Sequence, residues 1–169
     1  MAKTPVQFRL NGADKAVFVD GGENLLNVLR RGIGDMSVKF GCGQGTCGVC
    51  TVLIDGEPRL ACLTLAETCV GRGVETTLGL AEGPNLHPLQ EAFMEHFAAQ
   101  CGFCTSGMLM AAKALLDRNP SPTREDVAEA ISGNICRCTG YEPIINAILD
   151  AASKRGGQPT SGEQGRARI

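Results

Sequence analysis

Cysteine is the residue type whose number and spacing offer this sequence most chemistry. Nine cysteines occur in 169 residues, and four of them form a first set in which three are spaced C-x4-C-x2-C. This set consists of Cys42, Cys47, Cys50 and Cys62. Thiolates at such short spacing can hold metal ions, carry redox chemistry or pair as disulfides. Because an odd total fits a disulfide framework poorly, we expect metal ligands or redox groups.

The spacing of the first three cysteines is that of the plant-type loop that binds a 2Fe-2S cluster. Such a cluster is an anion and needs backbone N–H groups turned toward its sulfurs. Glycine allows this because it adopts positive φ angles without steric cost. Glycines alternate with the ligands at Gly41, Gly43, Gly45 and Gly48. We therefore predict a 2Fe-2S cluster, with Cys62 as fourth ligand from the second arm of a hairpin turning at Asp55 and Gly56.

Two other interpretations of this loop are weaker. Four thiolates could hold structural zinc, but zinc modules usually contain two well-separated C-x2-C pairs, whereas three ligands share one loop here. Residues 43–48 also match the pattern GxGxxG of dinucleotide-binding proteins. That pattern requires a following helix, and a strand is expected instead from Thr51 onward. Zinc is the remaining alternative to iron.

A second set of cysteines combines C-x2-C with C-x-C spacing and consists of Cys101, Cys104, Cys136 and Cys138. Each pair precedes a predicted helix, and helix N-termini present free N–H groups and a positive dipole end to an anion. A thioredoxin-like role for residues 101–104 would leave the second pair unexplained, and the βαβ pattern that it needs is absent. We predict that these four cysteines hold a second 2Fe-2S cluster.

The ninth cysteine and the two histidines have no partners by spacing. Cys69 is expected to be a small buried hydrophobic residue, the alternative being a reactive thiol or substitute ligand. His87 and His96 are expected at a helix start or on the surface, because eight cysteines already complete two sets of four ligands. No residue is predicted to be catalytic.

The first half of the chain must position the first set, and its pattern predicts a small mixed sheet with one helix. Asn24 is a typical N-cap for that short helix, and Gly32 is expected to end it. Alternating apolar residues and hairpin turns predict strands at residues 6–10, 16–19, 51–54, 59–63 and 74–77.

The second half is predicted to contain about four helices. The strand pattern stops near residues 80–88. Pro88, a capping box beginning at Thr123, and Pro143 indicate helix starts, and Phe97 is expected on the apolar face of the first of these helices. The predicted divisions are a ferredoxin-like domain at 1–81, a helical domain at 82–155 and a disordered tail at 156–169, with a docking arm as the alternative for the tail.

Charge and hydropathy argue against several classes of protein. A net charge of −2 gives no basic field for nucleic acid or anionic lipid. The longest stretch without a charged residue or histidine covers residues 97–112, but it contains polar residues and glycines, so no membrane span is predicted. Because the first residues lack the apolar region of a secretory signal and a twin-arginine pair, we expect a cytoplasmic protein.

Three segments carry motifs that are specific when they occur together. They are GCGQGTCGVC at 41–50, QCGFC at 100–104 and GNICRCTGY at 133–141. In this order, from Val6 to Ala152, the chain resembles the iron-sulfur small subunit of the xanthine dehydrogenase, or molybdenum hydroxylase, family. The resemblance implies an α+β fold, with an N-terminal β-grasp 2Fe-2S ferredoxin-like domain followed by a C-terminal four-helix 2Fe-2S-binding domain.

The resemblance also implies partners and an electron path. In the family, the cluster of the helical domain stands beside the molybdopterin-molybdenum cofactor of a large subunit, and the ferredoxin-like cluster faces the FAD of a medium subunit. Gln100 matches the glutamine that hydrogen-bonds the pterin, and Cys138 lies on the side where electrons enter. The implied function is an electron-transfer subunit of an oxidoreductase, without a catalytic centre of its own. A free-standing two-cluster ferredoxin is the alternative.

Overall fold

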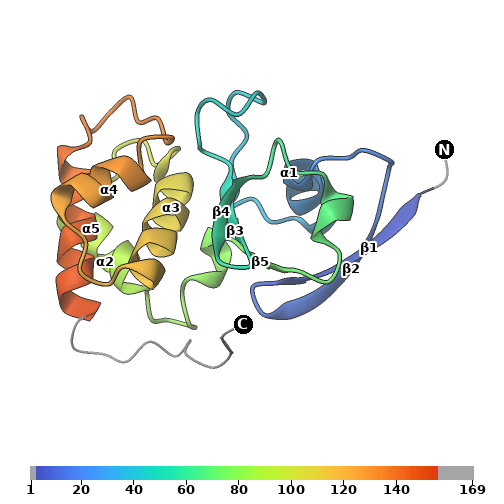
Figure 1. Ribbon diagram of the computed structural model, residues 1–169, viewed down its shortest axis with the longest axis horizontal. Coiled ribbons are helices and arrows are strands. Elements are labelled where there is room, and N and C mark those ends of the chain that lie inside the picture. Colours follow the sequence, from blue (N-terminus) through green and yellow to red (C-terminus); the bar gives the residue numbers. More distant parts are fainter. Residues whose placement is uncertain (1–2, 156–169) are drawn as a thin grey trace, which may run out of the picture.

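The computed structural model describes residues 3–155 and consists of a five-stranded sheet beside a group of four helices (Figure 1). The helix α3 (Thr105–Arg118) lies between the sheet and the other three helices of this group (Figure 1). The predicted disordered tail, residues 156–169, lies outside the described residues.

The sheet is mixed, with one parallel pair among antiparallel neighbours. Its strands are β1 (Thr4–Leu10), β2 (Ala13–Val19), β3 (Thr51–Ile54), β4 (Glu57–Leu60) and β5 (Gly73–Glu75). Their order is β2-β1-β5-β3-β4, and only β1 and β5 run parallel. A central parallel pair flanked by hairpins is the β-grasp arrangement, which confirms the predicted ferredoxin-like fold. The hairpin turn between β1 and β2 uses positive φ angles at Asn11 and Gly12.

The helix beside the sheet differs from the prediction at its C-terminal end. It begins as α1 (Leu25–Asn27) and continues as a π-helical segment, Val28–Ile33. The side chain of Asn24 accepts a hydrogen bond from the Asn27 N–H at 2.9 Å, which confirms the predicted N-cap. Gly32 does not end the helix; Gly34 does, because its φ of 88° allows the left-handed turn that closes the last bond.

The second half contains the four predicted helices. They are α2 (Pro88–Glu95), α3, α4 (Arg124–Ala130) and α5 (Glu142–Arg155). His87 caps α2, because its Nδ1 accepts from the Leu89 N–H at 3.2 Å while Gln90 Oε1 accepts from the His87 N–H at 2.9 Å. The predicted capping box at Thr123 also forms and starts α4.

Phe97 is not part of the apolar face of α2. The helix ends at Glu95, and Phe97 adopts a φ of 51° with 76% of its surface exposed. The Ala98 N–H returns to the carbonyl oxygen of Phe93 at 2.9 Å and the Phe97 N–H to that of Met94 at 3.2 Å. These two bonds form a Schellman motif, whose left-handed residue is more often glycine.

The sheet and the helices pack directly on each other. One core lies between the sheet and α1 and includes Leu25 and Leu29, while the other lies among the four helices. Val49, Leu53 and Leu80 come from the first half of the chain but belong to the helical core. The predicted division after residue 81 falls just before α2 and remains a prediction.

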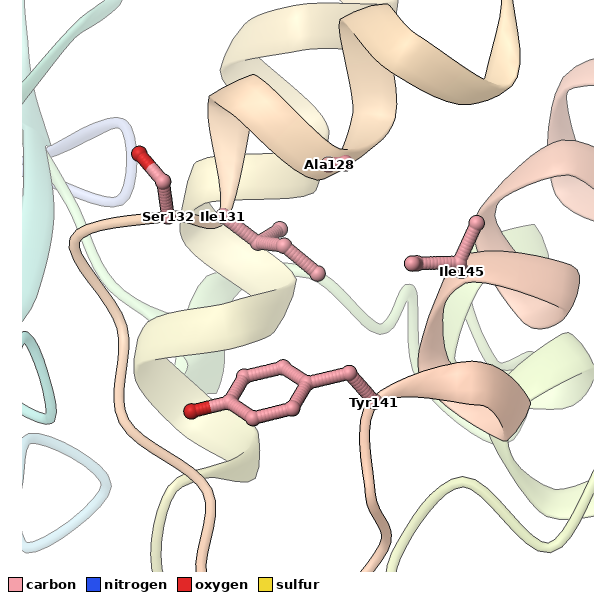
Figure 2. Close-up of a pocket in the computed structure, with 5 residues that line it drawn as sticks. All are labelled: Ala128, Ile131, Ser132, Tyr141 and Ile145. Carbon is pink, nitrogen blue, oxygen red and sulfur yellow. The ribbon is translucent and has the colours of Figure 1, made fainter.

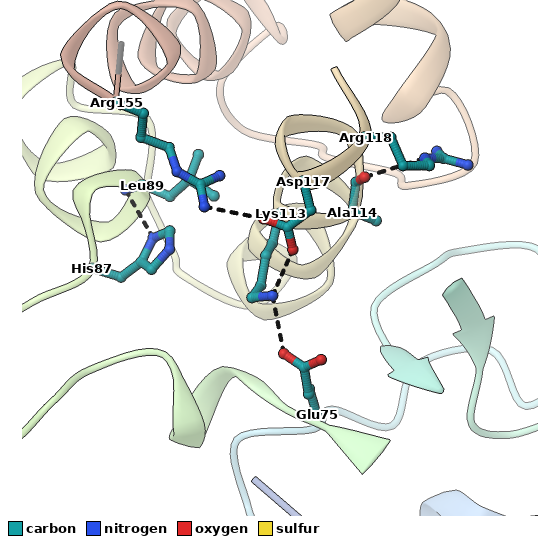
Figure 3. Close-up of polar contacts among 8 residues, drawn as sticks. All are labelled: Glu75, His87, Leu89, Lys113, Ala114, Asp117, Arg118 and Arg155. Carbon is teal, nitrogen blue, oxygen red and sulfur yellow. Dashed lines mark hydrogen bonds and ion pairs between the residues drawn. The ribbon is translucent and has the colours of Figure 1, made fainter. Parts of the chain in front are cut away.

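Ion pairs connect α3 to the sheet and to the end of α5 (Figure 3). Lys113 on α3 contacts Glu75 on β5 at 3.0 Å and Asp117, one helical turn further on, at 2.7 Å. Asp117 in turn contacts Arg155 at the end of α5 at 3.0 Å. Across residues 3–155, the structure contains no helix with the length and apolar character needed to span a membrane.

Candidate metal centres

The loop that carries Cys42, Cys47 and Cys50 runs from the end of the π-helical segment to β3, and glycine makes its turns possible. Gly43, Gly45 and Gly48 all have positive φ angles, between 67° and 83°, as predicted. Gly41 is needed for a different reason, because a Cβ there would lie 2.9 Å from the sulfur of Cys47. The loop is therefore wound tightly around its thiols.

The thiols of the first set differ in their electrostatic surroundings. The side-chain hydroxyl of Thr46, together with the Gln44 N–H at 3.5 Å, lowers the pKa of Cys42 to about 5. Burial raises the pKa of Cys50 to about 11, and the neighbouring thiol of Cys62 contributes to this rise. Metal binding removes these protons, because a coordinating thiol is deprotonated.

Cys62 reaches the loop from a turn and not from a strand. Since β4 ends at Leu60, the expectation that Cys62 lies in the hairpin arm is wrong. One residue beyond β4, the Ala61 N–H still donates to the carbonyl oxygen of Cys50 at 3.2 Å. That bond brings Cys62 and Cys50 together, so the two residues still share one site.

The second cysteine set comes together from two loops. The sulfur of Cys101 lies 3.6 Å from that of Cys138, and the side chains of Cys104 and Cys136 form a hydrogen bond. The spatial pairs therefore cross the pairs seen in the sequence and tie the start of α3 to the loop before α5. Cys104 and Cys136 are buried, whereas Cys101 and Cys138 are exposed.

Burial and hydrogen bonding act in opposite directions on these thiols. Burial raises the pKa of Cys104 to about 12. Burial also opposes ionisation of Cys136, but hydrogen bonds from Thr139 and from backbone N–H groups outweigh it and lower the pKa of that thiol. The pKa of Cys138 is raised through its contact with the thiol of Cys101.

The arrangement of the thiols fits a binuclear cluster. The thiols approach one another in pairs. A 2Fe-2S cluster requires pairs, because its four thiolates are shared between two irons. Both sets also offer only thiols as donors, which suits iron-sulfur chemistry.

Hydrogen bonds join the two cysteine loops directly. The Ile135 N–H donates to the carbonyl oxygen of Cys47 at 2.9 Å. Asn134 is buried, and its Nδ2 donates to the carbonyl oxygen of Gly48 at 2.9 Å and to Thr51 Oγ1 at 3.3 Å. Sequence reasoning missed Asn134, because nothing in its local pattern indicates a partner 86 residues away.

The other residues singled out from the sequence occupy ordinary positions. Gln100 is exposed, and its side-chain amide donates to the carbonyl oxygen of Phe97 at 3.3 Å. Cys69 is fully buried, as predicted, and burial raises its pKa. His96 caps the end of α2 and contacts Asp150 at 3.1 Å.

A pocket of about 210 Å³ lies between α4 and α5 (Figure 2). It is lined by Ala128, Ile131, Ser132, Tyr141 and Ile145. The ring of Tyr141 extends across it, and the phenolic oxygen accepts a hydrogen bond from the Cys136 N–H at 2.9 Å. The pocket therefore borders the loop of one candidate ligand.

Both halves of the chain match known protein families. The family described as "2Fe-2S iron-sulfur cluster binding domain" matches residues 8–67. The family described as "[2Fe-2S] binding domain" matches residues 76–149. The chain thus contains two 2Fe-2S-binding domains, one in each half.

Relatives extend over nearly the whole chain. The nicotine 6-hydroxylase small subunit of Paenarthrobacter nicotinovorans is 49% identical over 91% of this chain and 93% of its own length. The xanthine dehydrogenase iron-sulfur-binding subunit of Escherichia coli O157:H7 is 40% identical over 86% of this chain and 92% of its own.

Among solved structures, a chain of quinoline 2-oxidoreductase from Pseudomonas putida 86 is similar over 92% of this chain and 96% of its own length. The TM-score is 0.89 and the identity is 46%. With two 2Fe-2S domains in the same order and relatives of matching length, the chain belongs to the iron-sulfur small subunits of the xanthine dehydrogenase family of molybdenum hydroxylases.

Proposed function

We propose that this chain relays electrons from a molybdopterin centre in a large subunit to FAD in a medium subunit. The proposed ligands of the cluster in the ferredoxin-like domain are Cys42, Cys47, Cys50 and Cys62. The proposed ligands of the cluster in the helical domain are Cys101, Cys104, Cys136 and Cys138. When bound, a 2Fe-2S cluster accepts and donates single electrons.

The hydrogen bond between the Ile135 N–H and the Cys47 carbonyl oxygen is the observation that supports a relay most directly. Ile135 precedes Cys136 in the chain, so one hydrogen bond separates a proposed ligand of one cluster from the neighbour of a proposed ligand of the other. Buried Asn134 holds the same two loops together. These hydrogen bonds between the two loops support the proposal that the two ligand sets lie close enough to exchange electrons.

The surface around the second set favours a subunit over a free carrier. Cys101 and Cys138 are exposed, and the apolar side chains of Phe97, Phe103 and Ile135 are 76%, 49% and 52% exposed nearby in the chain. Exposed apolar groups are stabilised when a partner covers them. We propose that the molybdopterin-binding subunit covers this face, with the Gln100 amide directed toward the pterin.

Nine cysteines, eight of them proposed cluster ligands, suit a reducing compartment better than they suit a disulfide framework, and we propose the cytoplasm. The chain supplies no catalytic group in this proposal. Its residues provide thiolates, keep water from the buried ligands Cys50, Cys104 and Cys136, and orient the loops.

A redox titration of the native complex, monitored by electron paramagnetic resonance (EPR), tests the proposal. Two ligand sets in differently folded surroundings should give two 2Fe-2S signals with distinct midpoint potentials. Observation of one 2Fe-2S species that accounts for all of the iron would contradict the proposal.

A further inference from the structure

The loop formed by residues 136–141 closes on itself through hydrogen bonds that return to Cys136. The Cys136 N–H donates to the phenolic oxygen of Tyr141 at 2.9 Å. The Tyr141 N–H donates to Oγ1 of Thr139 at 3.1 Å, and that Oγ1 lies 3.2 Å from the sulfur of Cys136. The Thr139 N–H approaches the same sulfur at 3.5 Å. Thr139 thus directs both its hydroxyl and its N–H at the sulfur of Cys136.

Which atom donates in the hydrogen bond between the Thr139 hydroxyl and the Cys136 sulfur follows from which of the two carries a proton. A thiolate ligand has no proton and can only accept. The Tyr141 N–H already occupies one lone pair of Thr139 Oγ1, so the hydroxyl proton of Thr139 is free to point at the sulfur. Among the four thiols of the second set, within the described residues, only Cys136 has a hydroxyl partner.

The loop is held in this shape by its backbone and by packing. Gly140 and Tyr141 have φ angles of 68° and 69°, both in the left-handed region. The Tyr141 ring lines the pocket together with the side chains of Ile131 and Ile145 (Figure 2). Cys136 is only 8% exposed, so water competes little for its sulfur.

We propose that Thr139 is a positioning residue that raises the reduction potential of the cluster in the helical domain through the sulfur of Cys136. Reduction adds negative charge to the cluster and its thiolates, and a hydrogen bond to a ligand sulfur stabilises that charge. Tyr141 supports Thr139, because it holds both the backbone of Cys136 and the hydroxyl oxygen. This inference rests on the proposed function, since it takes Cys136 as a ligand.

The test is an EPR-monitored redox titration of the purified complex carrying Thr139→Val or Thr139→Ser. Valine has the shape of threonine without the hydroxyl, so the midpoint potential of one cluster should fall. Serine retains the hydroxyl and should keep that potential near the wild-type value. Tyr141→Phe should lower it less than valine does, because it removes the phenolic oxygen that holds the Cys136 N–H but keeps both the Thr139 hydroxyl and the Tyr141 N–H that bonds to it.

Thr46→Val is the matched control, because the Thr46 hydroxyl contacts Cys42 in the other loop. It should leave the potential of the helical-domain cluster unchanged. The signal of that cluster is identified as the one that Cys136→Ser abolishes. If Cys136→Ser abolishes no signal, the proposed ligand set is wrong, which is a separate failure from that of the present inference.

Three outcomes overturn the role of Thr139. The first is a wild-type potential in Thr139→Val, and the second is an equal fall in Thr139→Ser. The third is a Thr139→Val complex that lacks the cluster while the Thr139→Ser complex contains it. That result would show that the hydroxyl is needed to assemble the cluster and not to set its potential. If neither Thr139 variant holds the cluster, an unchanged potential in Tyr141→Phe overturns the inference.

Discussion

In each cysteine set, the surroundings lower the pKa of one thiol and raise the pKa of another. Cys42 has a lowered pKa while that of Cys50 is raised, and Cys136 contrasts in the same way with Cys104. Cys50 and Cys104, which are buried and have raised pKa values, stay neutral without metal, and this avoids the cost of an unpaired buried charge. Coordination then supplies the positive charge that compensates for deprotonation.

Cys136→Ser should remove one cluster and leave the ferredoxin-like cluster in place. A serine hydroxyl does not replace the thiolate, because its proton is held far more strongly. EPR of the purified complex should show one of two signals, and electron transfer from substrate to the acceptor should stop. Cys69→Ser is the control and should retain both signals, because Cys69 lies in the apolar core and its thiol hydrogen-bonds the carbonyl oxygen of Leu65, not another cysteine. Full turnover in Cys136→Ser would refute the ligand role.

His87→Asn should reduce the loss of stability on acidification. Burial, together with the nearby charges of Arg155 and Lys113, lowers the pKa of His87 to about 4 from 6.5. The unfolded chain therefore takes up a proton first, and stability falls as the pH drops from about 6.5 to about 4. Because the ring is partly exposed, we expect a loss of about 2 kcal/mol.

Asparagine also caps helices but does not titrate, so it separates capping from protonation. The melting temperature should fall less between pH 7 and pH 5 in His87→Asn than in the wild-type protein. Equal falls in the two proteins would show that His87 does not contribute to the pH dependence.

Residue identity predicted the composition of both cysteine sets, because thiols interleaved with glycines at short spacing have few uses other than metal binding. It did not predict the contact between Cys101 and Cys138 or the bonds of Asn134. These depend on how distant segments approach each other, and no local pattern encodes that approach.

Among the elements, the contact between α3 and the first cysteine loop depends on the absence of a side chain at Gly107. A Cβ at this position would lie 2.3 Å from the carbonyl oxygen of Gly48 and 2.9 Å from Asn134 Nδ2. The Gly48 carbonyl also accepts the hydrogen bond from Asn134. The helix therefore packs directly against the backbone of the loop.

Gly107→Ala should destabilise the protein by about 1–3 kcal/mol, although alanine favours helices, because the loop has to move away from α3. Gly133→Ala is the matched control: a Cβ there meets nothing within 4 Å and φ is not positive. Thermal unfolding of the two variants measures the difference in stability. Equal melting temperatures for Gly107→Ala and Gly133→Ala would show that the close packing at Gly107 contributes nothing to stability.

The elements themselves could be predicted where a cap or a turn marks them. Asn24, Thr123 and the turn at Asn11 and Gly12 each satisfy backbone groups locally, so their sequence signal is strong. The ends of helices were less predictable. Phe97 occupies a left-handed position that glycine normally marks, so the sequence carries no sign of it.

At the scale of the whole molecule, the exposed apolar residues beside the second cysteine set distinguish the two candidate functions. A tagged chain isolated from its source cell should co-purify with a chain large enough to bind molybdopterin, and with a flavin-binding chain. Size-exclusion chromatography with mass spectrometry checks this. Elution of the chain alone, with both clusters intact, would favour the free carrier.

The iron and acid-labile sulfide content of the natively isolated protein tests the central claim most directly. In the proposed function, eight thiolates in two sets of four hold two binuclear clusters, so about four irons and about four sulfides per chain are expected. A content of about two irons per chain, or of zinc without labile sulfide, would contradict the account.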